Sequence, residues 1–464
     1  MHLLHKICDT GQIQPIHTNN SVSRSRRVDT TPVALDIHQL SHDGRGVARR
    51  TSPEGKVVFV DYALPGEKVL AVQTRKHTHF DEAYCVEVLS PSPHRVAPRC
   101  PHFGVCSGCV LQHLDIDQQI LAKQTTLLEN LARIGRVHPQ SVIAPLTGTS
   151  WGYRRKGRFS VRHVAKKEKT LIGFRERNPR FVADLTTCHT IVPEIAQALP
   201  DLRELIEQLD VRQAVAQIEF SSTDTCTAIT IRHLAPLSSK DRALMIAFAS
   251  RHNWAIFLQP EGPDSIRVLW PERAQLSYYL HHWDIRFDFN PLDFIQVNAS
   301  INEKMLLKVM ETLNLSPNDH VLDLFCGLGN FTLPMARYAA HVIGVEGDAG
   351  LIARARGNAL VNKIDNVTFY SADLTQNQSA AVWLDTKCTI LLLDPPRSGA
   401  IDILKQLPLK RFQRIMYVSC HPASLARDAD YLVHYAGFTV KIAGVMDMFP
   451  HTAHVESMVL FESN

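Results

Sequence analysis

A cysteine and a glutamate near the carboxyl end of the chain have side chains suited to covalent catalysis. Cys420 directly follows the apolar run RIMYVS, and Glu456 lies in HVESMVLF, which is apolar beyond the acid. A thiol at the end of a buried strand, next to a helix start, is expected to have a lowered pKa and to be nucleophilic; the alternative is a buried structural thiol. An acid within an apolar strand is costly unless it is used; the alternative for Glu456 is a buried acid satisfied by His451 or His454.

A second motif predicts a binding loop for an adenosyl cofactor. The stretch VLDLFCGLGNFTLPMA at 321–336 is typical of a buried strand, a glycine-containing turn and a helix. Gly327 and Gly329 allow a tight turn and the close approach of a ligand. Glu346, about twenty residues further on, is placed to accept hydrogen bonds from ribose hydroxyls. Because the bulky Phe331 follows where a dinucleotide site would need a small residue, the loop favours S-adenosylmethionine over a dinucleotide.

Two more acids follow strand candidates in the same part of the chain. Asp373 ends the SAD of 371–373, where it is placed to contact an adenine amino group. Asp394 leaves the apolar run LLL and is followed by two prolines, which stiffen the turn that holds its carboxylate. An ordinary turn after a strand is the alternative for Asp394.

These residues need a parallel sheet that gathers them at one edge. From about residue 291, apolar strand candidates alternate with helical segments, as in sheets that are buried on both faces. The ligands of open α/β sheets gather at the carboxyl ends of the strands. We therefore predict an α/β protein in which residues 291–464 form a doubly wound, Rossmann-like methyltransferase domain.

The rest of the chain predicts three further segments. Residues 1–28 are polar and lack periodicity, which indicates a disordered arm. Residues 29–90 contain short β-rich runs separated by glycine and proline turns, as expected for a small barrel. Residues 91–290 are interpreted as a central α/β domain, with a helix predicted near 110–140.

Length and composition narrow the class of protein. A chain of 464 residues with 45% hydrophobic and 21% charged residues is typical of a soluble protein of two or three domains. No apolar run approaches the roughly 20 residues that span a bilayer, and a secretory signal is not found, so a cytoplasmic protein without a membrane partner is expected. Ten cysteines are too few for a disulfide scaffold of this length.

Three of these cysteines are closely spaced and predict a metal centre. Cys100, Cys106 and Cys109 have five and then two residues between them, a spacing that suits zinc or iron–sulfur. A Cys or His pair at zinc-finger spacing does not follow, and Cys188 is the best candidate for the fourth ligand. The cysteines in strand-like runs are expected in the core, namely Cys85, Cys226 and Cys388.

A basic stretch predicts a polyanionic partner. Residues 151–180 contain eleven Lys or Arg and two acids, a charge of +9, whereas the rest of the chain sums to −5. Such a local excess is typical of RNA-binding surfaces, although a solvated loop is the alternative. We expect Arg154, Arg155 and Lys156 to contact RNA phosphates, and Phe159 to lie in the core.

Methylation of uracil at C5 would use both the thiol and the acid. Uracil C5 is too weak a nucleophile to attack a sulfonium methyl group, but thiolate addition to C6 makes it an enolate carbon. After methyl transfer, a base must remove the C5 proton before the thiolate can leave. This chemistry favours a catalytic thiol at Cys420 and a catalytic base at Glu456.

Five motifs in order resemble the RNA uracil-C5 methyltransferases: FIQVN (294–298), DLFCGLGNF (323–331), DPPR (394–397), SCHPASLARD (419–428) and HVESMVLF (454–461). The resemblance implies that Cys420 is the nucleophile and Glu456 the base. It also implies a set of side chains that contact S-adenosylmethionine, namely Gln296, Phe325, Asn330, Glu346, Asp373 and Asp394. His421 stands where some relatives have asparagine, and relatives vary at Asp373.

The resemblance also covers the front of the chain. Residues 30–90, through DGRGVAR and VDYALPGEKV, resemble the TRAM domain, an OB-like RNA-binding barrel. Family members that act on ribosomal RNA carry a [4Fe–4S] cluster on four such cysteines, which implies Cys100, Cys106, Cys109 and Cys188 as ligands. A barrel and a cluster together favour an enzyme of 23S ribosomal RNA, and the resemblance implies that the helix near 110–140 packs on the last domain. No obligate protein partner is evident, and a monomer is expected.

Other functions stay open at this point. The same chemistry on transfer RNA, or on a different uridine of 23S ribosomal RNA, is one alternative. An iron–sulfur oxidoreductase would need a dinucleotide fingerprint, which is not found. An RNA-binding scaffold with an inactive methyltransferase fold is disfavoured by the presence of Cys420, Glu456 and the glycine loop.

Overall fold

The computed structural model describes residues 31–50 and 55–464, and these divide into two compact units. The first unit contains the described residues up to Lys123, with Arg175–Phe181 and Pro450–His454. The second contains Gln124–Phe174, Val182–Phe449 and Val455–Asn464. The segment 1–28, interpreted above as a disordered arm, lies outside the described residues.

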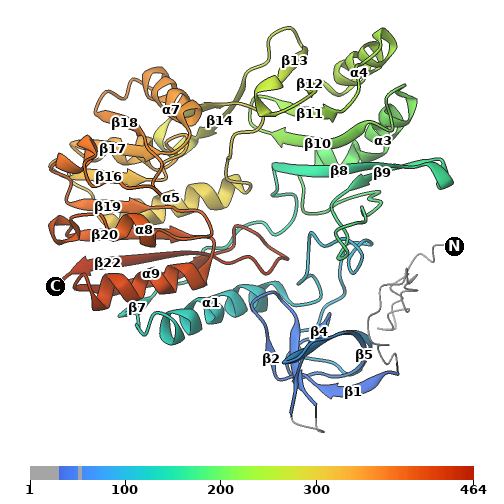
Figure 1. The fold of residues 1–464 in the computed structure, drawn as a ribbon, viewed down its shortest axis with the longest axis horizontal. Coiled ribbons are helices and arrows are strands. Elements are labelled where there is room, and N and C mark those ends of the chain that lie inside the picture. Colours follow the sequence, from blue (N-terminus) through green and yellow to red (C-terminus); the bar gives the residue numbers. More distant parts are fainter. Residues whose placement is uncertain (1–30, 51–54) are drawn as a thin grey trace. The chain divides into compact units, whose positions relative to one another are not determined.

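A six-stranded sheet forms the core of the first unit (Figure 1). Its strands pair antiparallel except for β4 and β6, which are parallel. Alternate apolar residues such as Val58, Val60 and Ala83 are buried between the strands, as the period-two pattern requires. In spatial order the strands are β1 (Val33–Asp36), β5 (Lys68–Lys76), β6 (Phe80–Ser90), β4 (Val57–Asp61), β3 (Gly46–Arg49) and β2 (Gln39–Leu40).

One long helix follows the cysteine-containing segment. Helix α1 spans Ile116–Arg133, which is shorter than the 110–140 expected. The side chain of Asp115, just before the helix, accepts a hydrogen bond from the N–H of Asp117 at 3.0 Å, as an N-cap residue does. After the helix, Arg136 pairs with Asp430 of α9 (Pro422–His434) at 2.7 Å within the second unit.

The second unit begins with a mixed six-stranded sheet (Figure 1). Helices α3 (Leu199–Gln208) and α4 (Ser239–His252) pack against its strands, and the short α2 (Pro193–Gln197) precedes α3. In spatial order the strands are β13 (Arg267–Trp270), β12 (Trp254–Gln259), β11 (Thr227–His233), β10 (Val215–Ser222), β8 (Lys156–Val164) and β9 (Lys169–Gly173).

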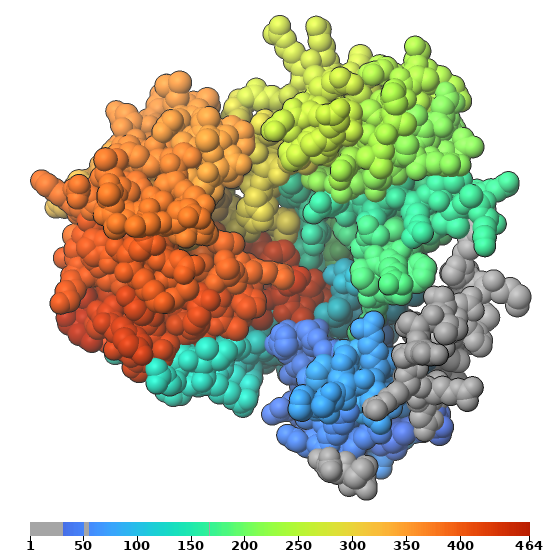
Figure 2. Space-filling model, in the orientation of Figure 1, coloured from blue at the N-terminus to red at the C-terminus, as the bar shows by residue number. Residues whose placement is uncertain are grey.

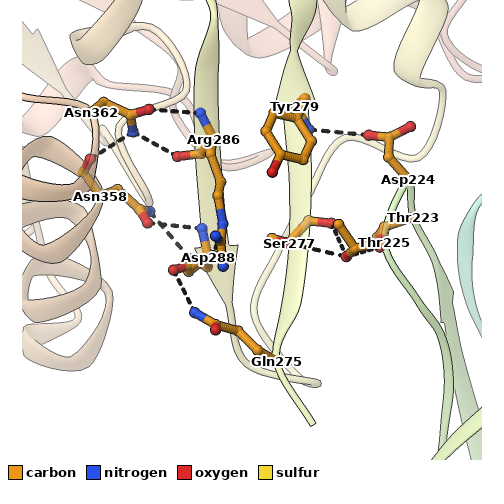
Figure 3. A network of polar contacts seen from close by, with 10 residues as sticks. All are labelled: Thr223, Asp224, Thr225, Gln275, Ser277, Tyr279, Arg286, Asp288, Asn358 and Asn362. Carbon is orange, nitrogen blue, oxygen red and sulfur yellow. Dashed lines mark hydrogen bonds and ion pairs between the residues drawn. The ribbon is translucent and has the colours of Figure 1, made fainter.

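A β-hairpin connects this sheet to the rest of the unit. Its strands are β14 (Leu276–Leu280) and β15 (Ile285–Phe289). On one side, Asp224 accepts a hydrogen bond from the N–H of Tyr279 at 3.1 Å (Figure 3). On the other, Asn358 of α7 (Ala349–Val361) and Asn362, which directly follows that helix, bind the β15 backbone. Each side-chain amide accepts a hydrogen bond from a backbone N–H and donates one to a backbone carbonyl, at 2.7–3.2 Å. The hairpin is therefore fixed to both neighbours through polar contacts.

An eight-stranded sheet forms the last part of the chain and confirms the predicted α/β class. Every described strand pair in it is parallel except the two made by β22. In spatial order the strands are β18 (Val367–Ser371), β17 (His341–Glu346), β16 (His320–Leu324), β19 (Ile390–Leu393), β20 (Arg414–Ser419), β22 (Glu456–Ser463), β21 (Phe438–Met446) and β7 (Ser141–Val142). The helices of this part are α5 (Ala299–Leu313), α6 (Thr332–Ala336), α7, α8 (Ile401–Leu404) and α9.

Side-chain caps define where the helices near this sheet begin. The side chains of Asn298, Asp348 and His421 each accept a hydrogen bond from a backbone N–H in the first turn of α5, α7 and α9. Such caps satisfy N–H groups that have no partner within the helix. None of the helices in the described part of the chain has the length and apolar character that crossing a membrane requires.

Candidate active site

Four of the predicted site residues lie at one edge of the eight-stranded sheet. Parallel strands end at the same edge, and Phe325 follows β16, Glu346 ends β17, Asp394 follows β19 and Cys420 follows β20. The sheet order places β17 and β19 on opposite sides of β16, and ligands of open α/β sheets bind where the order reverses in this way. We call this edge the catalytic edge.

The strand register brings Cys420 and Glu456 together. β22 runs antiparallel to β20, with Ser419 opposite Ser457 as the last pair. The next step along both strands places Cys420 opposite Glu456, which is the first residue of β22. Residues directly opposite in an antiparallel pair have Cβ atoms about 5 Å apart. The predicted nucleophile and the predicted base are therefore neighbours.

Burial and neighbouring acids favour the neutral forms of both groups. Burial raises the pKa of Glu456 well above its ordinary value, and Asp394 raises it further. The pKa of the Cys420 thiol is also raised, by burial first and then by Glu456 and Asp394, although Arg397 opposes this. The expected lowering of the Cys420 pKa is therefore wrong for this state, because two acids and partial burial outweigh the arginine and the helix start.

The glycine loop holds Glu346 through backbone N–H groups. Gly327 donates to Glu346 Oε2 at 3.2 Å, and Asp348 donates to Oε1 at 3.1 Å. The loop starts at Phe325, whose φ of +65° is unusual for a bulky residue, and the N–H of Phe325 donates to Val345 at 2.9 Å. Strained backbone of this kind concentrates at ligand sites, which agrees with a binding role for the loop.

Asp394 and Asp373 differ in their surroundings. Burial raises the pKa of Asp394 to about 7, so this carboxyl is poised between its neutral and charged forms at physiological pH. Asp373 lies beyond β18 and is exposed, and hydrogen bonds from Thr375 to its carboxylate lower its pKa. Both residues follow strands that end at the catalytic edge, as predicted.

Comparison with known families identifies the chain. The tRNA (uracil-5-)-methyltransferase family matches residues 149–464, which include the whole eight-stranded sheet apart from β7. The chain belongs to this family. The resemblance inferred from the five motifs is therefore confirmed.

Relatives and a solved structure agree with this assignment. Two proteins called 23S rRNA (uracil(1939)-C(5))-methyltransferase are similar over 442 residues, 95% of this chain and 100% of theirs: one from Xanthomonas campestris at 60% identity and one from Stenotrophomonas maltophilia at 59%. The Pyrococcus abyssi tRNA (uracil-54, C5)-methyltransferase, solved with S-adenosyl-L-homocysteine, shares the fold. It matches with a TM-score of 0.71 at 22% identity, over 92% of this chain and 100% of that one.

A polar network surrounds Asn330, which the family resemblance implies as a contact of S-adenosylmethionine. Asn330 and Asn302 of α5 exchange amide hydrogen bonds at 3.0 and 3.1 Å, and the hydroxyl of Tyr278 donates to Asn330 at 3.4 Å. The guanidinium of Arg155 lies 4.6 Å from the Tyr278 ring centre and donates to the carbonyl of Gln296 at 2.9 Å. Asn302 and Tyr278 lie outside every motif quoted above, and only the fold places them here.

Asp323 is a further acid of this methyltransferase that the sequence motifs did not single out. It is fully buried in β16, and Thr332 donates a hydrogen bond to its Oδ2 at 2.5 Å. Its Oδ1 has no hydrogen-bond partner within the described residues. Burial raises its pKa to about 8, and Asp394 and Glu346 add to the rise. The sequence pattern that could have identified Asp323 is an acid inside an apolar strand, the same pattern that identified Glu456.

The basic stretch of this methyltransferase is only partly a surface. Arg155 is 6% exposed, and Lys156 donates to the backbone carbonyls of Pro291 and Asp293 at 2.6 and 2.5 Å. Burial lowers the pKa of Lys156 to about 8. The expectation that both residues contact RNA phosphates is therefore wrong, because their side chains bind backbone carbonyls of the segment 291–296.

Two arginines of the same stretch fit the expectation better. Arg158 and Arg162 are exposed on one face of β8, on which alternate residues share a face. Arg232 of β11 is exposed on that face too, because it pairs with Gln217, which pairs with Ser160 of β8. Phe159 points to the opposite face and is fully buried, which confirms its prediction as a core residue.

The predicted cluster cysteines divide between the units. Cys100, Cys106 and Cys109 lie in the first unit, and Cys188 lies in the second, where its Sγ is 3.3 Å from the Thr190 hydroxyl. Within residues 31–50 and 55–464, no group of three or more His, Cys, Asp or Glu side chains is arranged to hold one metal ion. The other cysteines fit the core expectation only in part, because Cys85 and Cys388 are buried whereas Cys226 is half-buried.

An open cleft of about 940 Å³ lies in the second unit of this methyltransferase. It is lined by Pro291–Phe294, which precede Gln296, and by Asp348 and Arg354 at the start of α7. Figure 2 shows the surface of the second unit hollowed between the orange segment near residue 350 and the yellow-green segments.

Proposed function

We propose that this protein methylates C5 of a uridine in 23S ribosomal RNA with S-adenosylmethionine as the donor. The facing pair of Cys420 and Glu456 at the catalytic edge carries the proposal. A nucleophile and an acid on neighbouring strands, beside a glycine loop, match what C5 methylation needs. A dinucleotide oxidoreductase would not use this pair.

The two side chains act in a fixed order. The Cys420 thiolate adds to C6 of the uracil, and the electron pair of the C5–C6 bond moves toward O4, which makes C5 nucleophilic. S-adenosylmethionine held at the glycine loop would supply an electrophilic methyl group to C5, and the bond from the methyl group to the sulfonium sulfur would break to leave S-adenosylhomocysteine. Glu456 then accepts the C5 proton, the C5–C6 double bond reforms, and the bond from C6 to the Cys420 sulfur breaks.

The described residues fit a cationic donor. Glu346 would accept hydrogen bonds from the ribose hydroxyls, and Asn330 and Phe325 would line the loop around the donor. Gln296 and Asp373 would make the remaining contacts with the donor. Asp394 and Asp323 are buried acids with raised pKa values. A positive charge beside them favours their charged forms, so the donor's sulfonium would pair with these carboxylates. Asp394 is also one of the acids that raise the pKa of Cys420, and a cation beside it would weaken that effect.

The relatives indicate which RNA is methylated. The proteins at 59–60% identity are called 23S rRNA methyltransferases, whereas the transfer RNA enzyme is 22% identical. We therefore propose 23S ribosomal RNA, and a uridine equivalent to the position 1939 of their names. A cytoplasmic location follows from that substrate.

Mapping of 5-methyluridine tests the proposed function. 23S ribosomal RNA from cells with and without the gene is compared by mass spectrometry, and the purified protein is then assayed on the unmethylated RNA with tritiated donor. We expect one methylated uridine to disappear with the gene and to be restored by the protein. Label only in transfer RNA, or in no RNA, would contradict the proposal.

A [4Fe–4S] cluster on Cys100, Cys106, Cys109 and Cys188 is also proposed. A cubane takes one cysteine per iron, so its sulfur ligands are spread more widely than the ligands of a single metal ion. The N–H of Gly108 donates to Cys106 Sγ at 3.4 Å, a contact that suits a thiolate ligand.

A buried histidine beside the cysteine loop supports the same proposal. His113 is 1% exposed and packs against Phe103, which lies between Cys100 and Cys106, with ring centres 5.4 Å apart. Neither of its ring nitrogens has a hydrogen-bond partner in the described residues. A buried polar group without a partner is costly, and a bound cluster would offer sulfur acceptors.

RNA binding is proposed for two regions. The sheet β1–β6 at 29–90 would act as a TRAM-like barrel, and the domain boundaries at 90 and 290 are proposed with it. The exposed arginines Arg158, Arg162 and Arg232 share one face of the central sheet, where phosphate contacts are accessible.

A further inference from the structure

The loop that starts with Asp394 is fixed at its far end by one buried carboxylate. Asp428 of α9 is fully buried, and its Oδ2 accepts hydrogen bonds from the N–H of Ala400 at 2.6 Å and from the Tyr417 hydroxyl at 2.7 Å. Ala400 ends the sequence DPPRSGA, whose first residue is Asp394. Tyr417 lies in β20, three residues before Cys420. One side chain therefore joins the loop of Asp394 to the strand of Cys420.

The other oxygen of Asp428 strengthens the same connection. Arg427 donates to Asp428 Oδ1 through Nε at 2.8 Å and Nη2 at 2.7 Å. Nη2 also donates to the carbonyl of Ser398 at 2.8 Å, in the same loop. Charge-assisted hydrogen bonds of this kind are stronger than neutral ones and fix geometry more closely.

The loop has a glycine where these groups approach it. Gly399 has a φ of +82°, and a Cβ built there would lie 2.5 Å from Arg427 Nη2 and 2.7 Å from Asp428 Oδ2. A side chain at this position is excluded by both the backbone conformation and the neighbours. Three segments therefore meet with little freedom: the loop, β20 and α9.

We propose that Asp428 is a positioning residue that sets the place of the Asp394 carboxyl relative to Cys420. This inference rests on the proposed function, because the two groups act there on one donor and one uracil. Asp428 does not touch the reacting atoms, and its effect passes through Ala400 to the loop and through Tyr417 to β20. Displacement of a catalytic group by about 1 Å can lower a rate by roughly a hundredfold.

The variant Asp428→Asn tests the inference in the full chain. It keeps the size of the side chain but removes the charge that binds Arg427, so the loop is expected to move. We expect donor affinity, measured by calorimetry without RNA, to weaken by about tenfold, and kcat on RNA to fall by about 10- to 100-fold. KM for the RNA should change by less than about threefold, because no RNA contact is removed.

Leu432→Ala is the matched control, since Leu432 is fully buried in the same helix and forms none of these bonds. It should lower the melting temperature but leave kcat and donor affinity near wild type. If Asp428→Asn does not fold, Gly399→Ala displaces the loop from the opposite side and should give the same loss of donor affinity. Unchanged donor affinity in a folded Asp428→Asn or Gly399→Ala variant, or an equal loss in Leu432→Ala, would overturn the inference. Donor binding needs no RNA, so a wild type that binds donor but methylates no RNA contradicts the proposed function alone.

Discussion

Replacement of Glu456 by glutamine separates methyl transfer from product release. The side chain is 4% exposed, and burial, followed by Asp394, raises its pKa well above the ordinary value, so its surroundings disfavour the charged form. A glutamine has the same shape and carries no charge, so the folded protein should lose less than about 1 kcal/mol of stability. The amide cannot accept the C5 proton, however.

The size of the effect follows from the role of the base. General bases contribute about 10²- to 10⁴-fold to a rate, which corresponds to about 2.7 to 5.5 kcal/mol of barrier. Because proton removal comes after methyl transfer, the loss should fall on turnover and not on the first methyl transfer. The covalent bond from Cys420 to the methylated uracil should therefore persist.

A denaturing gel measures this directly. Glu456→Gln is incubated with RNA and tritiated donor, and label should appear in a protein–RNA band at close to one equivalent per enzyme. The double variant with Cys420→Ala is the control and should give no such band. Label released in free RNA at the wild-type rate, with no band, would refute the assignment of Glu456 as the base.

Four other changes test separate parts of the site. Cys420→Ala should abolish methylation and leave donor affinity within about twofold, because the thiol acts on the uracil; substantial residual turnover would contradict this. Donor affinity should fall as the pH drops through about 7, since the Asp394 carboxyl becomes neutral there and no longer attracts a cation. The fall is limited to about tenfold per pH unit, and calorimetry on Asp394→Asn should show a weaker dependence of donor affinity on pH. Anaerobically purified protein should be brown and lose its absorbance when any of the four cluster cysteines becomes serine, whereas stoichiometric zinc without iron would exclude the cluster. The pair Arg158→Ala and Arg162→Ala should weaken RNA binding and reduce the log–log salt slope by up to about two contacts, whereas an unchanged slope would assign the RNA surface elsewhere.

Local sequence was enough to place the residues that end parallel strands. Glu346, Asp394 and Cys420 each follow an apolar run, and strands of a parallel sheet end at one edge, so the site could be assembled without knowing the strand order. The sign of the Cys420 pKa shift could not be predicted in this way. It depends first on the burial of the thiol and then on Glu456, which the register of β22 brings near the thiol from 36 residues further along the chain.

Charge composition was a poorer guide than strand periodicity. The stretch 151–180 has an excess of positive charge, but charge alone does not distinguish a buried arginine from an exposed one. Arg155 is buried with its guanidinium over the Tyr278 ring, whereas Arg158 is exposed. Lys156 binds backbone carbonyls that lie about 135 residues away in the chain. Such long-range contacts leave no local signal, and for the same reason Asn302 and Tyr278 were not found.

The direction of one strand makes the proposed chemistry possible. All other described pairs in the eight-stranded sheet are parallel, so those strands bring only their carboxyl ends to the catalytic edge. β22 runs the opposite way between β20 and β21, and its first residue lies at that edge. β22 pairs with a strand on each side, with β20 up to Ser457 and with β21 up to Glu456 itself. This pairing holds Glu456 at the catalytic edge beside the end of β20, where Cys420 follows.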